Sequence, residues 1–254
     1  LHRLIRRQRQ MCIRDRWKCS SGEAKIWTKV DLAASGSKIL KLYYDGIVGE
    51  NLPNGDDVFD FFDDFDGNDL DTNKWSDISG SWDVSNSLLS QTDTSEGHHL
   101  LKATYTTQSN EIYEMCGKVL DNVTHENYIG ISHRCADNDN FYAFYLTSVV
   151  DLTNSGNRWG KNVSGAWSLV TEAVDDYGHD IDVFYKLKLR KVGDTFTFYV
   201  NGDQKFSSSD TSLSADAFGI WMYNNKAKCD YIFVRKYTAN EPSVSVGDEQ
   251  IIYR

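Results

Sequence analysis

The chain has 254 residues, 27 of them basic and 37 acidic, so its formal net charge at pH 7 is −10. A chain of this sign repels phosphate backbones and anionic lipid, which disfavours nucleic acid and membrane surfaces as partners. No apolar run approaches the ~18 residues of a transmembrane helix, so membrane insertion is not predicted.

Residues 1–16, LHRLIRRQRQMCIRDR, carry six of the arginines and differ in composition from all that follows. A basic nucleic-acid arm or the start of a signal peptide would also be arginine-rich, but no apolar segment follows as a signal peptide requires. The segment resembles a translated sequencing adapter, so we interpret it as foreign and disordered, with the true N-terminus and any signal peptide missing. Without it, 21 basic and 36 acidic residues remain, a net charge of −15.

Short runs of alternating apolar and polar residues, rich in aromatic and β-branched side chains, predict an all-β fold. The expected strands are 24–32, 38–45, 58–65, 82–91, 99–107, 111–120, 127–135, 140–150, 165–172, 181–192, 194–206, 217–224 and 229–237. No segment has a convincing helical period. Strands this closely spaced, joined by turns such as Asn201-Gly202, predict antiparallel hairpins stacked as two sheets.

Alternation also predicts which side chains face the core. Phe218, Ile220 and Met222 should point inward, which leaves Trp221 and Tyr223 on the outer face. In the same way, Tyr199 should lie outside on 194–206, and Ile181 and Val183 should point inward on 181–192. The outer faces of these three strands are both aromatic and polar, a pattern that would suit a shallow sugar platform.

Three segments resemble the concanavalin A-like lectin/glucanase superfamily, of the LamG-like jelly-roll type. They are FDFFDDFDGNDLDTNKWSDISGSWDVSNSLLSQ at 59–91, YKLKLRKVGDTFTFYVNG at 185–202 and FGIWMYNNKAKCDYIFVRKY at 218–237. The resemblance implies an antiparallel jelly-roll β-sandwich over residues 56–238, with residues 239–254 as a tail or linker. Residues 17–55 resemble the end of an uncharacterised module found in secreted prokaryotic proteins, and would form a short truncated β appendage. A secreted or cell-surface location and further domains in a larger chain follow from the resemblance; we expect a monomer.

Glycanases of this fold carry a Glu-x-Asp-x-x-Glu string or a one-residue-longer variant, and no glutamate of this chain stands in one. A pair made by Asp182 and an acid of the 171–180 loop is the remaining catalytic alternative. No Gly-x-Ser-x-Gly, Walker or His-Glu-x-x-His motif occurs, and His98 and His99 are interpreted as surface histidines. The sequence therefore predicts no catalytic residue, and a glycoside hydrolase or lyase is the least favoured function.

An Asp-rich turn raises the question of calcium, which takes several carboxylate and carbonyl oxygens from a tight loop. The candidate ligands are Asp64, Asp66, Asp69 and Asp71. The alternative is a turn whose side chains bond their own backbone, and we favour it because the full calcium-loop pattern is absent. Cofactors are thus limited to a possible structural calcium. The cysteines show no zinc spacing, and either one disulfide or buried thiols is compatible with their positions.

The binding hypothesis rests on aromatic rings, which stack on sugar C–H faces, and on planar donors for hydroxyls. The candidate ligand-binding residues are Trp221, Tyr223, Asn224, Tyr199, Arg134, Tyr145 and Trp167. The competing interpretation is that these rings are core, and that Arg134 pairs with an aspartate. The leading function is a non-catalytic carbohydrate- or cell-surface-binding module of a secreted multidomain protein, with a structural or adhesive spacer as the alternative.

Overall fold

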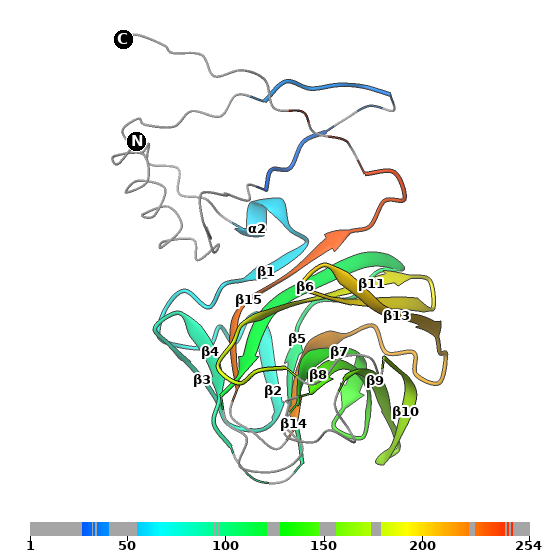
Figure 1. Cartoon of the computed structure of the whole chain (residues 1–254). Helices are drawn as coiled ribbons and strands as arrows, with labels where there is room; N and C mark the ends of the chain where they lie inside the picture. The colour runs from blue at the N-terminus through cyan, green and yellow to red at the C-terminus, as the bar shows by residue number, and fades with distance from the viewer. Residues whose placement is uncertain are drawn as a thin grey trace.

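The computed structural model shows an antiparallel β-sandwich, two sheets packed face to face (Figure 1), which confirms the predicted fold class. It describes residues 27–31, 33, 35–40, 55–93, 95, 97–120, 128–147, 156–173, 179–223, 227–241, 243 and 245. Within these residues the only helix is α2 (Gly55–Val58), and no helix among them is long and apolar enough to cross a membrane.

One sheet has eight strands. In sheet order they are β13 (Asp203–Ser209), β12 (Thr195–Val200), β11 (Tyr185–Val192), β6 (Asn110–Val119), β15 (Ala227–Lys236), β4 (Leu88–Gln91) and β3 (Trp82–Ser85), with β1 (Phe61–Asp63) also paired to β15. Strand β15 meets β4 through residues 227–229 and β1 through residues 232–234. The two short strands therefore share one edge of β15, on either side of the irregularity between Cys229 and Tyr231.

The other sheet has seven strands. In sheet order they are β10 (Ala166–Ala173), β9 (Asn157–Val163), β8 (Asn140–Thr147), β7 (Tyr128–Asp137), β14 (Phe218–Tyr223), β5 (His98–Ala103) and β2 (Trp75–Ser79). We call the outer face of this sheet the front face, and the outer face of the eight-stranded sheet the back face. The core lies between the two sheets.

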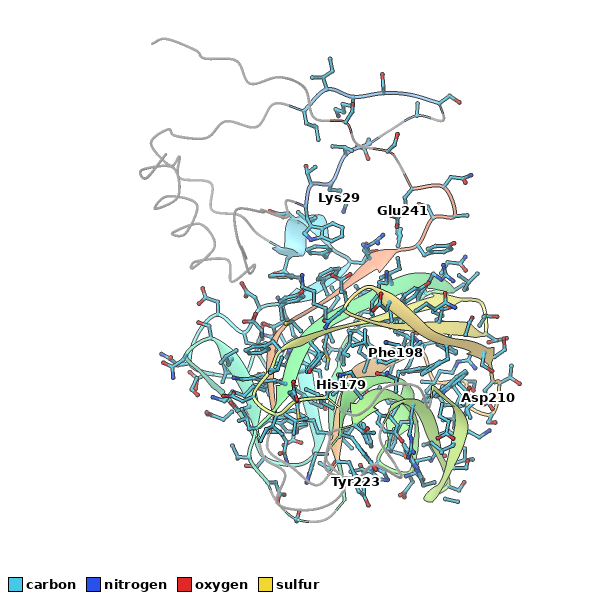
Figure 2. All side chains as sticks on the ribbon, in the orientation of Figure 1. Lys29, His179, Phe198, Asp210, Tyr223 and Glu241 are labelled. Carbon is cyan, nitrogen blue, oxygen red and sulfur yellow. The ribbon has the colours of Figure 1, made fainter. Side chains whose placement is uncertain are left out.

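Alternation along the strands assigns side chains to the core as expected. Phe218, Ile220 and Met222 of β14 are fully buried in the main core cluster, as is Phe198 of β12, which Figure 2 labels between the sheets. Both faces of β14 are nevertheless buried, because Trp221 is also inaccessible to solvent. The front face therefore has an apolar layer of its own.

Turn chemistry explains two hairpins. Asn201 (φ 51°) and Gly202 (φ 96°) join β12 to β13, which confirms the predicted Asn-Gly hairpin. The prediction of one strand over 82–91 is wrong. Asn86 (φ 52°) and Ser87 (φ 51°) adopt the left-handed conformation and turn the chain back between β3 and β4.

Other predicted strands are wrong where a segment with an alternating pattern pairs with no neighbouring strand. Ile39 is 89% exposed, and residues 27–31 and 35–40 form no strand; the remainder of the expected strands 24–32 and 38–45 lies outside the described residues. Ile181 and Val183 are exposed rather than inward-facing, because β11 begins only at Tyr185. Conversely, β2 and β9 were not predicted.

The back face carries a separate aromatic cluster, to which the segment that precedes the sandwich adds Trp27 and Phe59. Phe233 and Tyr231 project from β15, and Phe59 stacks on Phe233 with ring centroids 4.2 Å apart. Trp27 packs edge-on against both Phe59 (5.6 Å) and Phe233 (5.5 Å). We call Trp27, Phe59, Phe62, Tyr231 and Phe233 the back-face cluster. The chain itself covers Phe233 and Tyr231, which accounts for their burial.

Candidate ligand-binding site

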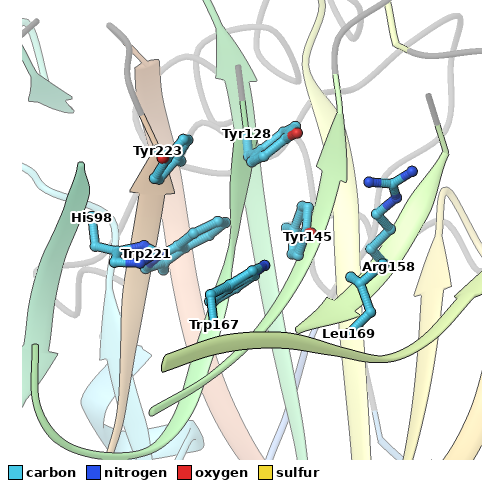
Figure 3. Close-up of a pocket in the computed structure, with 8 residues that line it drawn as sticks. All are labelled: His98, Tyr128, Tyr145, Arg158, Trp167, Leu169, Trp221 and Tyr223. Carbon is cyan, nitrogen blue, oxygen red and sulfur yellow. The ribbon is translucent and has the colours of Figure 1, made fainter. Parts of the chain in front are cut away.

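The front face carries a pocket of about 280 Å³ (Figure 3). Its lining comes from six strands of the seven-stranded sheet and consists of His98, Tyr128, Tyr145, Arg158, Trp167, Leu169, Trp221 and Tyr223. We call it the front pocket. Its volume lies near the lower limit of the ~300–1,000 Å³ typical of small-molecule sites.

Strand register explains why these residues meet. Trp221 lies opposite Gly130, Gly130 opposite Tyr145, and Tyr145 opposite Arg158, so the four form one row across β14, β7, β8 and β9. The neighbouring row places Tyr223 between His98 of β5 and Tyr128 of β7. Residues directly opposite in antiparallel strands project from the same face. The pocket floor is therefore built by pairing alone.

Trp167 forms the outer wall of the front pocket, on the side away from the sheet. Its ring stacks on that of Trp221, with centroids 5.6 Å apart and an interplanar angle of 7°, although three strands separate β10 from β14. The end of the sheet must therefore curl over the front face. Gly160 makes this possible, because a Cβ atom there would lie 2.1 Å from the Trp167 ring. Trp167 is 37% exposed, whereas Trp221 beneath it is fully buried.

His98 closes one end of the pocket as a neutral ring. The indole Nε1 of Trp221 donates a hydrogen bond to His98 Nδ1 at 3.2 Å. Burial among aromatic rings, helped by the nearby His99, lowers the pKa of His98 to about 4, and the charge of Asp139 opposes this only in part. His98 therefore carries no charge at neutral pH.

Arg158 closes the other end, across the rings from His98 (Figure 3). Its Nε lies 3.3 Å from Oε2 of Glu172, the residue directly opposite on β10. The Arg158 side chain is only 11% exposed and that of Glu172 is 40% exposed. Arg158 supplies the single formal charge among the eight lining residues, and no carboxylate is among them.

The structure brings together four of the seven predicted ligand-binding residues. Trp221, Tyr223, Tyr145 and Trp167 line the front pocket, and Asn224 lies outside the described residues. Tyr199 lies in the eight-stranded sheet, where the Lys188 ammonium sits 4.0 Å from its ring centre. The prediction of one platform shared by three strands is wrong, because β11 and β12 belong to one sheet and β14 to the other.

Arg134 is held away from the pocket by its own contacts. It pairs with Asp194 and donates hydrogen bonds to the backbone carbonyls of Leu213 (2.7 Å) and Asp210 (3.1 Å). Its guanidinium also lies 5.5 Å from the ring centre of Phe196. These contacts match the alternative in which Arg134 pairs with an aspartate.

Four lining residues are absent from the sequence-based set: His98, Tyr128, Arg158 and Leu169. The interpretation of His98 and His99 as surface histidines is wrong, since His98 is half-buried in the pocket and His99 is 3% exposed. Arg158 was missed with the whole of β9, in which Gly160 interrupts the alternating pattern. Tyr128 and Leu169 do lie in expected strands. The alternation of side chains between the two faces of those strands was the signal that could have placed them on the outer face.

In the Asp-rich turn, side chains bond to nearby backbone. Asp71 Oδ1 accepts a hydrogen bond from the amide of Asn73 at 2.9 Å, and Asp64 Oδ1 accepts one from the amide of Asp66 at 3.4 Å. Asp66 also accepts from the Ser87 hydroxyl, and Asp69 is exposed. Among the described residues no group of three or more His, Cys, Asp or Glu side chains is placed to hold a metal ion.

The cysteines covered by the structure, Cys116, Cys135 and Cys229, are buried thiols. Burial raises the pKa of the Cys135 thiol to about 12, so it stays protonated. Cys12 and Cys19 lie outside the described residues.

Residues 11–78 match a family described as a domain of unknown function, DUF2341. The match includes residues 11–16 of the segment interpreted as foreign and extends through β1 to β2 in the sandwich. No curated protein matches the chain.

Several solved structures share the fold at low sequence identity. The carbohydrate-binding module CBM66 from Bacillus subtilis is 18% identical with a TM-score of 0.57, and the match covers 65% of this chain and 98% of that one. The GH43 protein BlXynB from Bacillus licheniformis is 15% identical with a TM-score of 0.54, over 69% of this chain and 39% of that one. The Emp47p carbohydrate recognition domain is 8% identical with a TM-score of 0.52, over 69% and 94%. At these identities the likeness is one of fold.

Proposed function

We propose that the chain is a non-catalytic carbohydrate-binding module of a secreted or cell-surface multidomain protein, and that the front pocket holds the sugar. The observation that carries this proposal is Trp167, a ring 37% exposed that is stacked on the fully buried Trp221 beside Arg158. Trp221 supports the exposed ring from beneath, and polar groups stand at both ends of the pocket.

The chemistry of the lining suits a sugar. Sugar rings present C–H faces that pack on aromatic rings, and the hydroxyls around them need hydrogen-bonding groups at the rim. Trp167 offers the stacking surface, while Arg158, His98 and the tyrosine hydroxyls offer the polar contacts. The fold supports the same proposal, because a carbohydrate-binding module and a carbohydrate recognition domain share it.

Hydrolysis is less well supported than binding. A glycosidase needs two carboxyl groups about 5–10 Å apart across the scissile bond, and none of the eight lining residues that the structure describes carries one. Asp182, the catalytic alternative from the sequence, is paired with Lys118 at 2.5 Å. Its hydrogen bond to Lys118 lowers the pKa of Asp182, whereas a general acid needs a raised one.

The competing proposal is a structural or adhesive spacer. What favours it is the complete burial of Trp221 and Tyr145, which a purely structural aromatic layer would also show. The two proposals differ on Trp167, because a packing role does not require a ring to be left partly exposed above a pocket.

A glycan-array screen of the full chain tests the proposal, with Trp167→Ala and Tyr199→Ala compared at equal concentration. Tyr199 is a matched aromatic control on the eight-stranded sheet. We expect the wild type and Tyr199→Ala to bind the same glycans and Trp167→Ala to lose them. Absence of binding by folded wild-type protein, or binding that survives in Trp167→Ala and disappears in Tyr199→Ala, would overturn the proposed site.

A further inference from the structure

The hydrogen-bonding groups of the front pocket are mainly donors. The Trp221 indole nitrogen can only donate, so the His98 Nδ1 that receives its hydrogen bond must be the unprotonated nitrogen. A neutral His98 therefore carries its proton on Nε2, which is a donor. Arg158 and Trp167 are also donor-only side chains. The tyrosine hydroxyls both donate and accept, and none of the eight described lining side chains is acceptor-only.

The charge of the lining, like its hydrogen-bonding groups, favours a ligand that is an acceptor. Arg158 brings a largely buried positive charge to one end of the pocket, in a chain whose net charge is −10. Among the described residues, two acidic groups act on the lining from outside it: Glu172 beside Arg158, and Asp139, whose charge acts on His98. Glu172 forms an ion pair with Arg158 at 3.3 Å, and the Arg158 Nε makes no hydrogen bond in it.

A neutral sugar is an imperfect partner for such a lining, because each of its hydroxyls carries a proton that needs an acceptor. A carboxylate only accepts hydrogen bonds, and arginine binds it with planar, charge-assisted geometry. An aromatic wall with an arginine at its end therefore matches a sugar ring that bears one acidic group.

We infer that the front pocket selects a uronic-acid residue, with the sugar ring stacked on Trp167 and the carboxylate at Arg158. This inference rests on the proposed function. Glu172 then acts as a competitor for Arg158, since its carboxylate is already paired with the same positive charge.

The test measures binding of oligosaccharides of glucuronic, galacturonic and mannuronic acid to the full chain, each beside its methyl ester. The ester keeps the ring and removes the charge. We expect at least one free acid to bind roughly 10-fold or more tightly than its ester, as charge-assisted hydrogen bonds predict. That preference should shrink as salt is raised. Esters or other neutral sugars that bind as tightly as the acids would overturn this inference and leave the proposed function standing; no binding of any sugar would overturn both.

Three variants locate the selectivity. Arg158→Gln should abolish the preference for acid over ester, and Glu172→Gln should raise the affinity for the acid by removing the competitor. Lys188→Gln removes the same charge from the back face and should leave the preference unchanged. If Arg158→Gln does not fold, Glu172→Gln and the wild-type comparison still decide. A preference that survives in Arg158→Gln, or that Lys188→Gln removes, contradicts the assignment to Arg158.

Discussion

The two outer faces of the sandwich carry aromatic clusters that the rest of the chain covers to different extents. On the back face, Trp27 and Phe59 cover Phe233, so the chain itself fills the space above the sheet. On the front face, β10 is the one strand among the described residues that reaches over the cluster, and a pocket lies beside Trp167. A ring that its own chain covers, as Trp27 and Phe59 cover Phe233, acts as packing. A layer that is covered in part has room for a ligand.

The largest expected effect on stability comes from removing a fully buried ring from the aromatic layer of either face. Phe233→Ala and Trp221→Ala each remove a fully buried aromatic side chain, so each should lower the free energy of unfolding by about 3–5 kcal/mol. Urea unfolding of the two variants measures this. If Trp221→Ala were as stable as the wild type while Phe233→Ala were not, the front layer would not be packed as described.

Trp167→Ala should separate binding from stability. Its ring is partly exposed at the end of the sheet, so we expect a loss of stability below about 1 kcal/mol. Sugar binding should weaken by about 2 kcal/mol, roughly 30-fold, as for a central aromatic anchor. Titration calorimetry and urea unfolding of the same preparation give both values. Equal losses in the two measurements would mean that Trp167 acts as packing, like the back-face cluster.

Lowering the pH should reduce the free energy of unfolding through the protonation of His98. The pKa of His98 is about 4 in the folded chain and about 6.5 when unfolded, so the unfolded chain takes up the proton first as the pH falls. The stability that neutral His98 contributes is fully present above pH 6.5 and is lost as the pH falls toward 4. The full shift corresponds to about 3 kcal/mol, which solvent screening of a half-buried ring reduces to about 1–2 kcal/mol.

Urea unfolding at pH 7 and pH 4.5, in wild type and His98→Gln, measures this contribution. The pKa values of His99 and His133 are also lowered by burial, so both proteins should lose stability in acid, and the variant should lose less. Equal losses would show that His98 does not titrate as described.

The smallest expected effect is that of calcium removal. The Asp-rich turn is held by hydrogen bonds to backbone amides, such as that from Asn73 to Asp71, and by Asp63, which accepts from the Trp75 indole at 2.6 Å. We therefore expect the same thermal midpoint with calcium and with chelator. A lower midpoint with chelator would show that these carboxylates hold a cation, and would revive the calcium alternative.

The sandwich was predictable because the alternating pattern is local. Phe218, Ile220 and Met222 reach the core as the period of two requires, and Asn201-Gly202 turns as its composition indicates. Both features depend on a few adjacent residues, which a sequence displays directly.

The site was only partly predictable because it depends on which strands become neighbours. Alternation placed Trp221 and Tyr223 on an outer face, but could not show that Tyr199 belongs to the opposite sheet. The contact between Trp167 and Trp221 joins strands that are distant in the sequence and in the sheet, and requires the curl permitted at Gly160. Arg158 was missed because that same glycine breaks the pattern of β9. The feature that shapes the pocket thus also concealed one of its residues.

The most direct test of the account uses the indole N–H signals of the tryptophans in proton–nitrogen correlation spectra, with Trp27 and Trp167 assigned by mutation. Titration with a sugar found on the array should shift the Trp167 signal saturably and leave that of Trp27, on the back face, in place. A saturable titration that moves Trp27 while Trp167 stays fixed, or that moves neither, would contradict the claim that the front pocket is the binding site.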